Sequence, residues 1–87
     1  MNKKMYKRNK RVAGRVLDGK FCLMNPKTCE LIVMNETGTF LWDLLKEEIN
    51  FETIMSKMIC EFDAPEEEIK KDLVEFLNKL TENELLV

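Results

Sequence analysis

The segment from Leu31 to Leu45 changes its hydrophobic period from that of a strand to that of a helix within a few residues. Residues 31–34 form an uninterrupted apolar run, and from residue 40 onward the apolar positions recur at helical spacing. Asn35 lies between the two patterns, where its side chain can accept a hydrogen bond from a backbone N–H of the first helical turn. The segment therefore predicts a strand that leads directly into a helix.

The length of the chain limits what it can do. Its 87 residues allow one domain, and a domain of this size buries only about 60–65% of its unfolded surface, which leaves little room for a deep catalytic pocket. An apolar share of 45% and a charged share of 34% fit a compact soluble domain rather than a disordered chain or a membrane protein. No apolar block follows the basic amino terminus, so we identify no signal peptide and expect a cytoplasmic protein.

Two turn signals divide the first part of the chain into strands. Gly19, in the sequence Asp-Gly-Lys, can supply the positive φ angle of a tight hairpin, and Pro26 suits the first central position of a second turn. These turns separate three predicted strands, at residues 11–17, 21–25 and 29–34. We expect a three-stranded antiparallel meander.

Three helical patterns follow the predicted strands. The first extends over residues 35–48, and Asn50 is placed to cap the second, whose apolar residues recur at helical spacing up to Phe62. Asp63 resembles the start of a capping box for the third helix, with Pro65 in its first turn. The expected fold class is α+β and winged helix-turn-helix-like: a three-stranded antiparallel sheet followed by three helices. We expect the apolar residues 85–87 to close the core.

Charge is divided unequally along the chain. Residues 1–20 carry eight basic groups and one acidic group, so the overall net charge of -2 leaves residues 21–87 with a balance of -9. We therefore separate a basic arm at residues 1–10 from a globular domain at residues 11–87. The arm could contact nucleic acid, an acidic peptide or an acidic protein surface, or it could be a partly disordered solubilising tail, and the sequence leaves these alternatives open.

The helix-turn-helix outline suggests nucleic-acid binding as an alternative function. A recognition helix approaches phosphates and is expected to be basic, yet residues 63–83 hold seven acidic and three basic groups. Only the basic arm could then hold DNA, and such contact would be weak and strongly dependent on salt. Charge therefore argues against this alternative.

The sequence contains no pattern typical of catalysis. It lacks histidine and a phosphate-binding glycine loop, and its only serine, Ser56, lies within the second helical pattern. The three cysteines have no metal-binding spacing, so we interpret them as reduced structural thiols. A redox role for Cys22 and Cys29 would require their side chains to face each other. We expect no enzymatic activity, no cofactor and no metal.

Asn35, Gly38 and Trp42, together with the strand pattern of residues 17–24 that precedes them, resemble the pyrroloquinoline quinone biosynthesis protein D (PqqD-like) family. The resemblance covers residues 11–87. It implies a recognition element for ribosomally made, post-translationally modified peptides, a non-catalytic adaptor that captures a precursor's leader peptide. The implied partner is a modifying enzyme, either a radical S-adenosylmethionine enzyme or a leader peptidase of the kind that serves lasso peptides.

The resemblance also implies where the leader lies, as an added strand beside the third strand and in the groove between it and the third helix. In that strand Leu31 and Val33 point to one face while Ile32 and Met34 point to the other, so both faces are apolar. An edge of this kind can supply backbone hydrogen bonds and side-chain pockets to a guest strand. Alternatively, the helices cover one face and the arm covers the other, or the arm covers the edge in a homodimer.

On the third helix, Val74 and Leu77 widen the apolar surface beyond the main stripe, beside Lys70. Lys70 and Lys71 could pair with leader carboxylates, or with glutamates of their own helix. The predicted peptide-binding residues are Cys29, Glu30, Leu31, Ile32, Val33, Met34, Lys70, Lys71, Val74 and Leu77.

Overall fold

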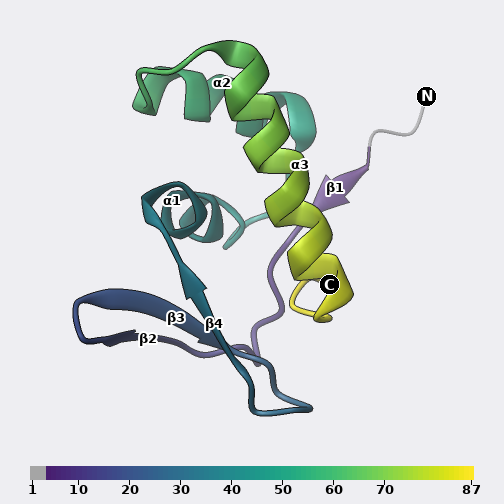
Figure 1. Cartoon of the computed structure of the whole chain (residues 1–87). Coiled ribbons are helices and arrows are strands. Elements are labelled where there is room, and N and C mark those ends of the chain that lie inside the picture. Colours follow the sequence, from purple (N-terminus) through teal and green to yellow (C-terminus); the bar gives the residue numbers. More distant parts are fainter. Residues whose placement is uncertain (1–3) are drawn as a thin grey trace.

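The computed structural model describes residues 4–87, and most of its sheet precedes its helices, as expected (Figure 1). The elements are β1 (Met5–Tyr6), β2 (Gly14–Leu17), β3 (Lys20–Met24), β4 (Leu31–Met34), α1 (Glu36–Leu44), β5 (Ile49–Asn50), α2 (Phe51–Glu61) and α3 (Glu66–Glu82). Strands β2, β3 and β4 pair in that order and are antiparallel. The predicted fold class, α+β with a three-stranded antiparallel sheet and three helices, is confirmed.

The two turns of the sheet differ in length. Asp18 and Gly19 both have positive φ angles, 52° and 76°, as a two-residue hairpin turn requires. The second turn is longer than predicted, because the side-chain oxygen of Asn25 accepts a hydrogen bond from the backbone N–H of Lys27 at 2.9 Å and Cys29 adopts a φ of 62°. Strand β4 therefore starts at Leu31 rather than at residue 29, and the expectation that Cys29 and Glu30 belong to the strand was wrong.

Asparagine side chains cap the first two long helices. The Oδ1 atom of Asn35 accepts a hydrogen bond from the N–H of Gly38 at 2.9 Å, and that of Asn50 accepts one from Thr53 at 2.8 Å, so both predicted caps are confirmed. The predicted capping box of α3 was wrong: Pro65 occupies the N-cap position, and no side chain caps the helix. The three glutamates of its first turn complement the helix dipole instead.

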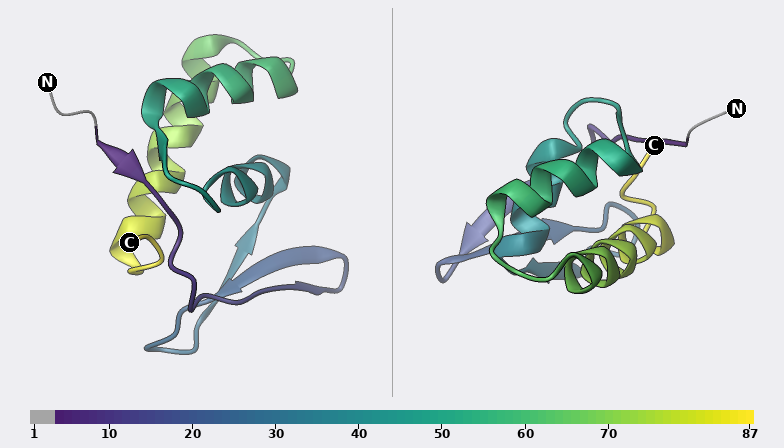
Figure 2. Two further views of the ribbon diagram at one scale, coloured as in Figure 1. Left: turned by 180° about the vertical axis from the view of Figure 1, so that it is seen from behind. Right: turned by 90° about the horizontal axis from the view of Figure 1, so that it is seen from above.

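The described part of the basic arm packs against β5 and the carboxyl end of the chain. Strand β1 pairs antiparallel with β5, placing Tyr6 opposite Ile49. The N–H of Arg8 donates to the carbonyl of Leu45 at 2.8 Å, and the N–H of Val87 donates to the carbonyl of Lys7 at 2.8 Å. Figure 2 shows this segment between the α1–β5 connection and the carboxyl end of α3. The division of the chain at residue 11 stays a prediction, and residues 1–3 of the arm lie outside the described residues.

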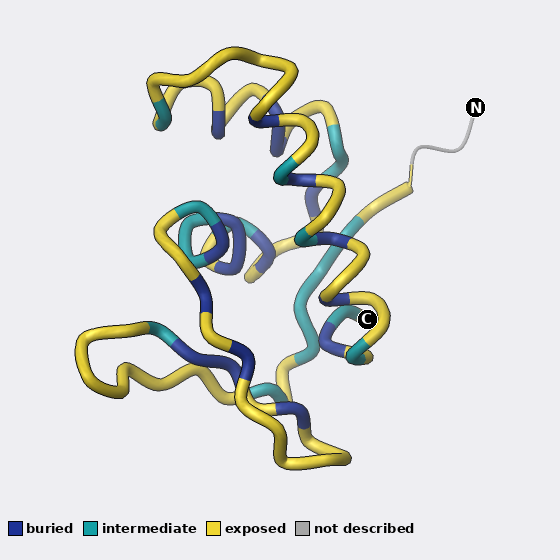
Figure 3. Tube along the Cα trace, viewed as in Figure 1, coloured by how far each residue is buried: buried dark blue, intermediate teal, exposed yellow. Residues whose placement is uncertain are grey.

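The core lies between one face of the β2–β4 sheet and the helices (Figure 3). The sheet contributes Leu23 and Ile32 to this core. The expectation that residues 85–87 close the core is confirmed for Leu85, which is fully buried, and was wrong for Val87, which is 82% exposed. All three cysteines are free thiols: Cys22 is buried, whereas Cys29 and Cys60 are exposed. None of the helices formed by residues 4–87 has the length and apolar character needed to cross a membrane.

Candidate functional site

Strand β4 is one of the two edge strands of its sheet, and two hydrogen bonds identify which of its backbone groups face the open edge. On β3 and just beyond it, the N–H of Met24 donates towards β2, to Ala13 at 3.3 Å, whereas that of Asn25 donates to Glu30 at 2.9 Å. Along an antiparallel strand, the backbone N–H and C=O groups of successive residues point to alternate sides. Leu23 and Phe21 therefore bond towards β4, and the backbone groups of their partners Ile32 and Met34 point towards β3.

The same alternation directs the N–H and C=O groups of Leu31 and Val33 away from β3, towards the open edge. Their side chains are exposed, whereas those of Ile32 and Met34 are buried among the helices. The predicted alternation of the strand's side chains is therefore confirmed. The described part of the arm pairs with β5 instead of covering Leu31 and Val33. The edge thus combines unused backbone groups with apolar side chains.

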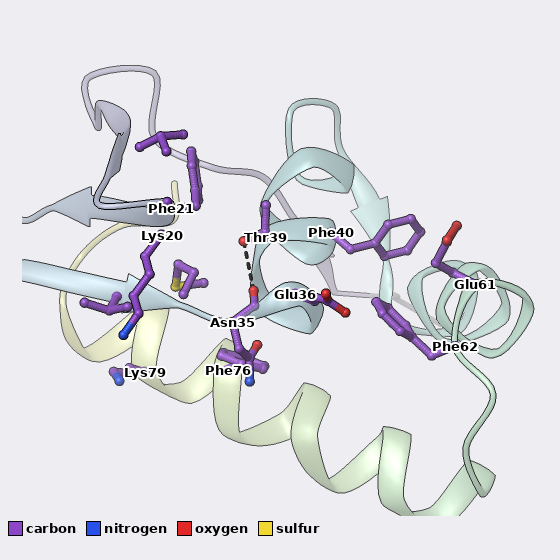
Figure 4. Close-up of a pocket in the computed structure, with 14 residues that line it drawn as sticks. Lys20, Phe21, Asn35, Glu36, Thr39, Phe40, Glu61, Phe62, Phe76 and Lys79 are labelled. Carbon is purple, nitrogen blue, oxygen red and sulfur yellow. Dashed lines mark hydrogen bonds between the residues drawn. The ribbon is translucent and has the colours of Figure 1, made fainter.

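A hollow of about 1030 Å³ lies beside this edge, between β4, the start of α1 and the helices α2 and α3 (Figure 4). We call it the groove. Its apolar lining comes from Val16, Phe21, Val33, Met34, Phe40, Phe62 and Phe76. Its charged lining comes from Lys20, Glu36, Glu61 and Lys79. Of the ten residues predicted to bind a peptide, Val33 and Met34 line the groove, and none of those predicted on α3 does.

At Gly38 of α1, side chains from strand β4 and helix α3 pack closely against the helix backbone. A Cβ atom added at Gly38 would lie 2.7 Å from the Cε atom of Met34 and 2.9 Å from the Cε1 atom of Phe76. Only a glycine in the first turn of α1 lets the ring of Phe76 approach so closely. This contact fixes which side of α3 faces the groove.

The flank of α3 that faces the groove differs from the predicted one. Successive residues turn by about 100° around a helix, so Lys79 shares the flank of Phe76, as their common place in the groove lining shows. By the same geometry, Lys70 and Val74 lie on the opposite flank of the buried stripe. Lys71 is exposed on the outer side of the helix, and Leu77 is buried in the core.

The charges of the groove are separated along its length (Figure 4). Lys20 and Lys79 lie at the end formed by the sheet, and Glu36 and Glu61 lie towards α2. Between them, the hydroxyl of Thr39 is satisfied by the carbonyl of Asn35 at 2.8 Å. A free strand edge beside an apolar groove with charged ends suits an extended peptide, since the edge binds the peptide backbone and the groove receives alternate side chains.

Comparison with known proteins identifies the family. The family description "Coenzyme PQQ synthesis protein D (PqqD)" matches residues 21–86. The chain belongs to the PqqD family. A solved structure described as "TbiB1 in Complex with the TbiA(beta) Leader Peptide" is similar to this PqqD-family chain, with a TM-score of 0.75 and 26% sequence identity over 92% of this chain and 93% of that one. A search of curated proteins gave no match.

Twelve of the fourteen residues that line the groove of this PqqD-family chain were not among the predicted site residues; they include Phe76, Lys79 and Lys20. By sequence alone, Phe76 falls in the apolar stripe of the third helix, Lys79 is one of the three basic groups of residues 63–83, and Lys20 belongs to the hairpin turn around Gly19. The helical pattern places Phe76 in the stripe and Val74 beside it, and it does not show which of the two faces the groove. A signal was present only in Gly38, because a glycine early in a helix indicates the close approach of another side chain, though not which one.

Proposed function

We propose that this protein captures the leader peptide of a ribosomally made precursor and presents it to a modifying enzyme. The observation that carries the proposal is the orientation of Leu31 and Val33, whose backbone groups face an open edge directly beside an apolar groove. Membership of the PqqD family and the likeness to TbiB1, which was solved with a leader peptide, support it.

In this proposal the leader adds to the sheet as a fourth strand beside β4. Hydrogen bonds to Leu31 and Val33 hold its backbone without regard to sequence. Its side chains alternate, so that every second one enters the groove towards Phe76. We place the α3 contacts at Phe76 and Lys79 instead of Lys70, Lys71, Val74 and Leu77, because the former line the groove. Cys29 and Glu30 flank the start of the added strand.

The charged groups of the groove give the leader a preferred placement. Lys20 and Lys79 attract carboxylate side chains at the sheet end, and Glu36 and Glu61 attract basic ones at the other end. Exposed charges of this kind contribute about 0.2–1 kcal/mol each. They select among peptides and set their register, whereas the apolar lining supplies most of the affinity.

The role is that of an adaptor that makes and breaks no covalent bond and needs no cofactor. Its partner is a modifying enzyme, either a radical S-adenosylmethionine enzyme or a leader peptidase, and the capture takes place in the cytoplasm where the precursor is made. A homodimer that paired its β4 edges would compete with the leader. Nothing in the comparisons favours nucleic-acid binding, and the exposed glutamates of α3 would repel phosphates.

The experiment that tests the proposal compares two variants in titrations with the leader of the precursor peptide encoded beside this chain. Val33→Pro removes an N–H that faces the open edge and leaves the hydrogen bonds between β4 and β3 in place. An edge strand tolerates proline at such a position. Lys57→Ala, on the exposed side of α2, is the control. We expect at least a tenfold loss of affinity for Val33→Pro and no change for Lys57→Ala. Equal affinities, with both variants folded by thermal unfolding, would exclude strand addition.

A further inference from the structure

The face of the β2–β4 sheet that points away from the helices carries an apolar surface most of which lies outside the groove. In the strand register, Cys22 of β3 lies between Arg15 of β2 and Val33 of β4, and Met24 lies opposite Leu31. All five side chains are on this face. We call it the outer face; its residues are Arg15, Leu17, Lys20, Cys22, Met24, Leu31 and Val33. The core-facing residues Leu23, Ile32 and Met34 occupy the other side.

Large apolar side chains on the outer face are exposed to solvent. The exposed fractions are 44% for Leu17, 38% for Met24, 50% for Leu31 and 55% for Val33. An antiparallel sheet with one solvated face normally carries polar residues there, and contiguous apolar surface on a small protein marks an interaction site. Cys22, between these side chains, is already buried by its neighbours. The outer face therefore has the composition of an interface.

Charge indicates what kind of partner covers it. The charged strand residues of the outer face are Arg15 and Lys20, both basic, and both belong to the basic first part of the chain, residues 1–20. A second copy of this chain, using the same face, would bring basic groups against basic groups, which is unfavourable. The complementary partner is a different protein, with an apolar patch bordered by carboxylates.

The position of the outer face identifies that partner. A leader strand paired with β4 would extend the sheet, and its second set of side chains would lie next to Leu31 and Val33 on the outer face. A protein docked there touches the adaptor and the leader together. We propose that the outer face binds the modifying enzyme, through an apolar surface with an acidic border; this inference rests on the proposed function.

The experiment measures binding of the purified modifying enzyme encoded beside this chain to the leader-loaded protein. Met24→Glu places a carboxylate in the apolar surface, on the central strand β3 opposite Leu31, and Arg15→Glu reverses a charge at its border. Ile59→Glu, at a residue of α2 with a similar exposed fraction of 41%, is the matched control. We expect at least a tenfold loss of enzyme affinity for Met24→Glu, a severalfold loss for Arg15→Glu and no change for Ile59→Glu.

Leader affinity is measured on the same variants and separates the two proposals. We expect it to be unchanged in all three, because none of the substituted residues lines the groove or belongs to β4. Enzyme binding that survives both Met24→Glu and Arg15→Glu would overturn the docking surface while leaving leader capture intact. Failure of the unaltered protein to bind the leader would instead contradict the proposed function.

Two further measurements complete the test. Sedimentation of the unaltered protein should show a monomer, and a dimer that Met24→Glu dissociates would assign the outer face to a second copy and overturn the inference. Thermal unfolding checks that each variant is folded. If Met24→Glu does not fold, Leu17→Glu on the neighbouring strand β2 replaces it, with the same expected loss of enzyme affinity.

Discussion

Asn25 ties the sheet to the carboxyl end of α3 by donating from its side-chain amide to both the carbonyl of Asn83, at 3.2 Å, and the Oδ1 atom of Asn83, at 3.3 Å. Its own side-chain oxygen accepts from the backbone of the β3–β4 turn. Asn25 is the buried polar residue among the described ones. Because it joins the turn before β4 to the end of α3, it sets the separation of the two elements that border the groove.

We predict that Asn25→Ala lowers the free energy of unfolding by about 1–3 kcal/mol, since it removes a buried side chain that satisfies several backbone groups. The variant should also bind the leader more weakly, because the β3–β4 turn and α3 are no longer held together. Denaturant unfolding checks the first effect and titration the second. Asn78→Ala, at an exposed position of α3, should change neither; similar stability of the two variants would contradict this role of Asn25.

Arg8 joins the basic arm to the body of the protein. Its guanidinium lies 5.5 Å from the centre of the Trp42 ring and donates to the Trp42 carbonyl at 3.2 Å. We predict that Arg8→Ala costs about 1–2 kcal/mol of stability, measured by thermal unfolding. Lys10→Ala, in the same arm but exposed, should have little effect. An equal effect of the two substitutions would mean that only the charge of the arm matters.

Gly38 leaves room for the ring of Phe76 and the end of Met34. We predict that Gly38→Val forces these side chains apart and lowers stability by about 1–3 kcal/mol, although valine has the higher helix propensity. Ser56→Val, on the exposed side of α2, controls for the propensity of valine itself. Denaturant unfolding makes the comparison. A Gly38→Val variant as stable as Ser56→Val would show that the close contact is readily relieved.

Lys79 and Lys70 lie on opposite flanks of α3, so a matched pair of substitutions tests which flank binds the leader. We predict that Lys79→Glu weakens binding of an acidic leader about 2–5-fold at low ionic strength, and less at high salt, because the groove is exposed. Lys70→Glu should have no such effect. Isothermal titration at two salt concentrations measures both. A larger loss of affinity for Lys70→Glu would show that the leader binds the flank of α3 predicted from the sequence, the one that carries Lys70.

The sequence predicted the elements where a single residue type has a strong local effect. Asn35 and Asn50 mark helix starts because their side chains satisfy free N–H groups. Gly19 marks a hairpin because a positive φ angle costs it little. Asp63 carried the same kind of signal, but α3 begins only after Pro65, with no side-chain cap.

Other features could not be read from the sequence because they depend on tertiary contact. Strands β1 and β5 have two residues each, too few for any periodicity, and form because the arm passes beside the end of α1. The flank of α3 that meets β4 follows from the packing of Phe76 on Gly38. A helical pattern gives the centre of the buried stripe but not which neighbouring element lies on either side of it.

The most direct test of leader capture is amide hydrogen exchange of the isotopically labelled protein, with and without the leader encoded beside it. Ile32 and Met34 already bond to β3 and should be protected in both states, whereas Leu31 and Val33 should become protected only when the leader is bound. Leader binding that leaves the exchange of Leu31 and Val33 unchanged would contradict strand addition to β4, whatever its affinity.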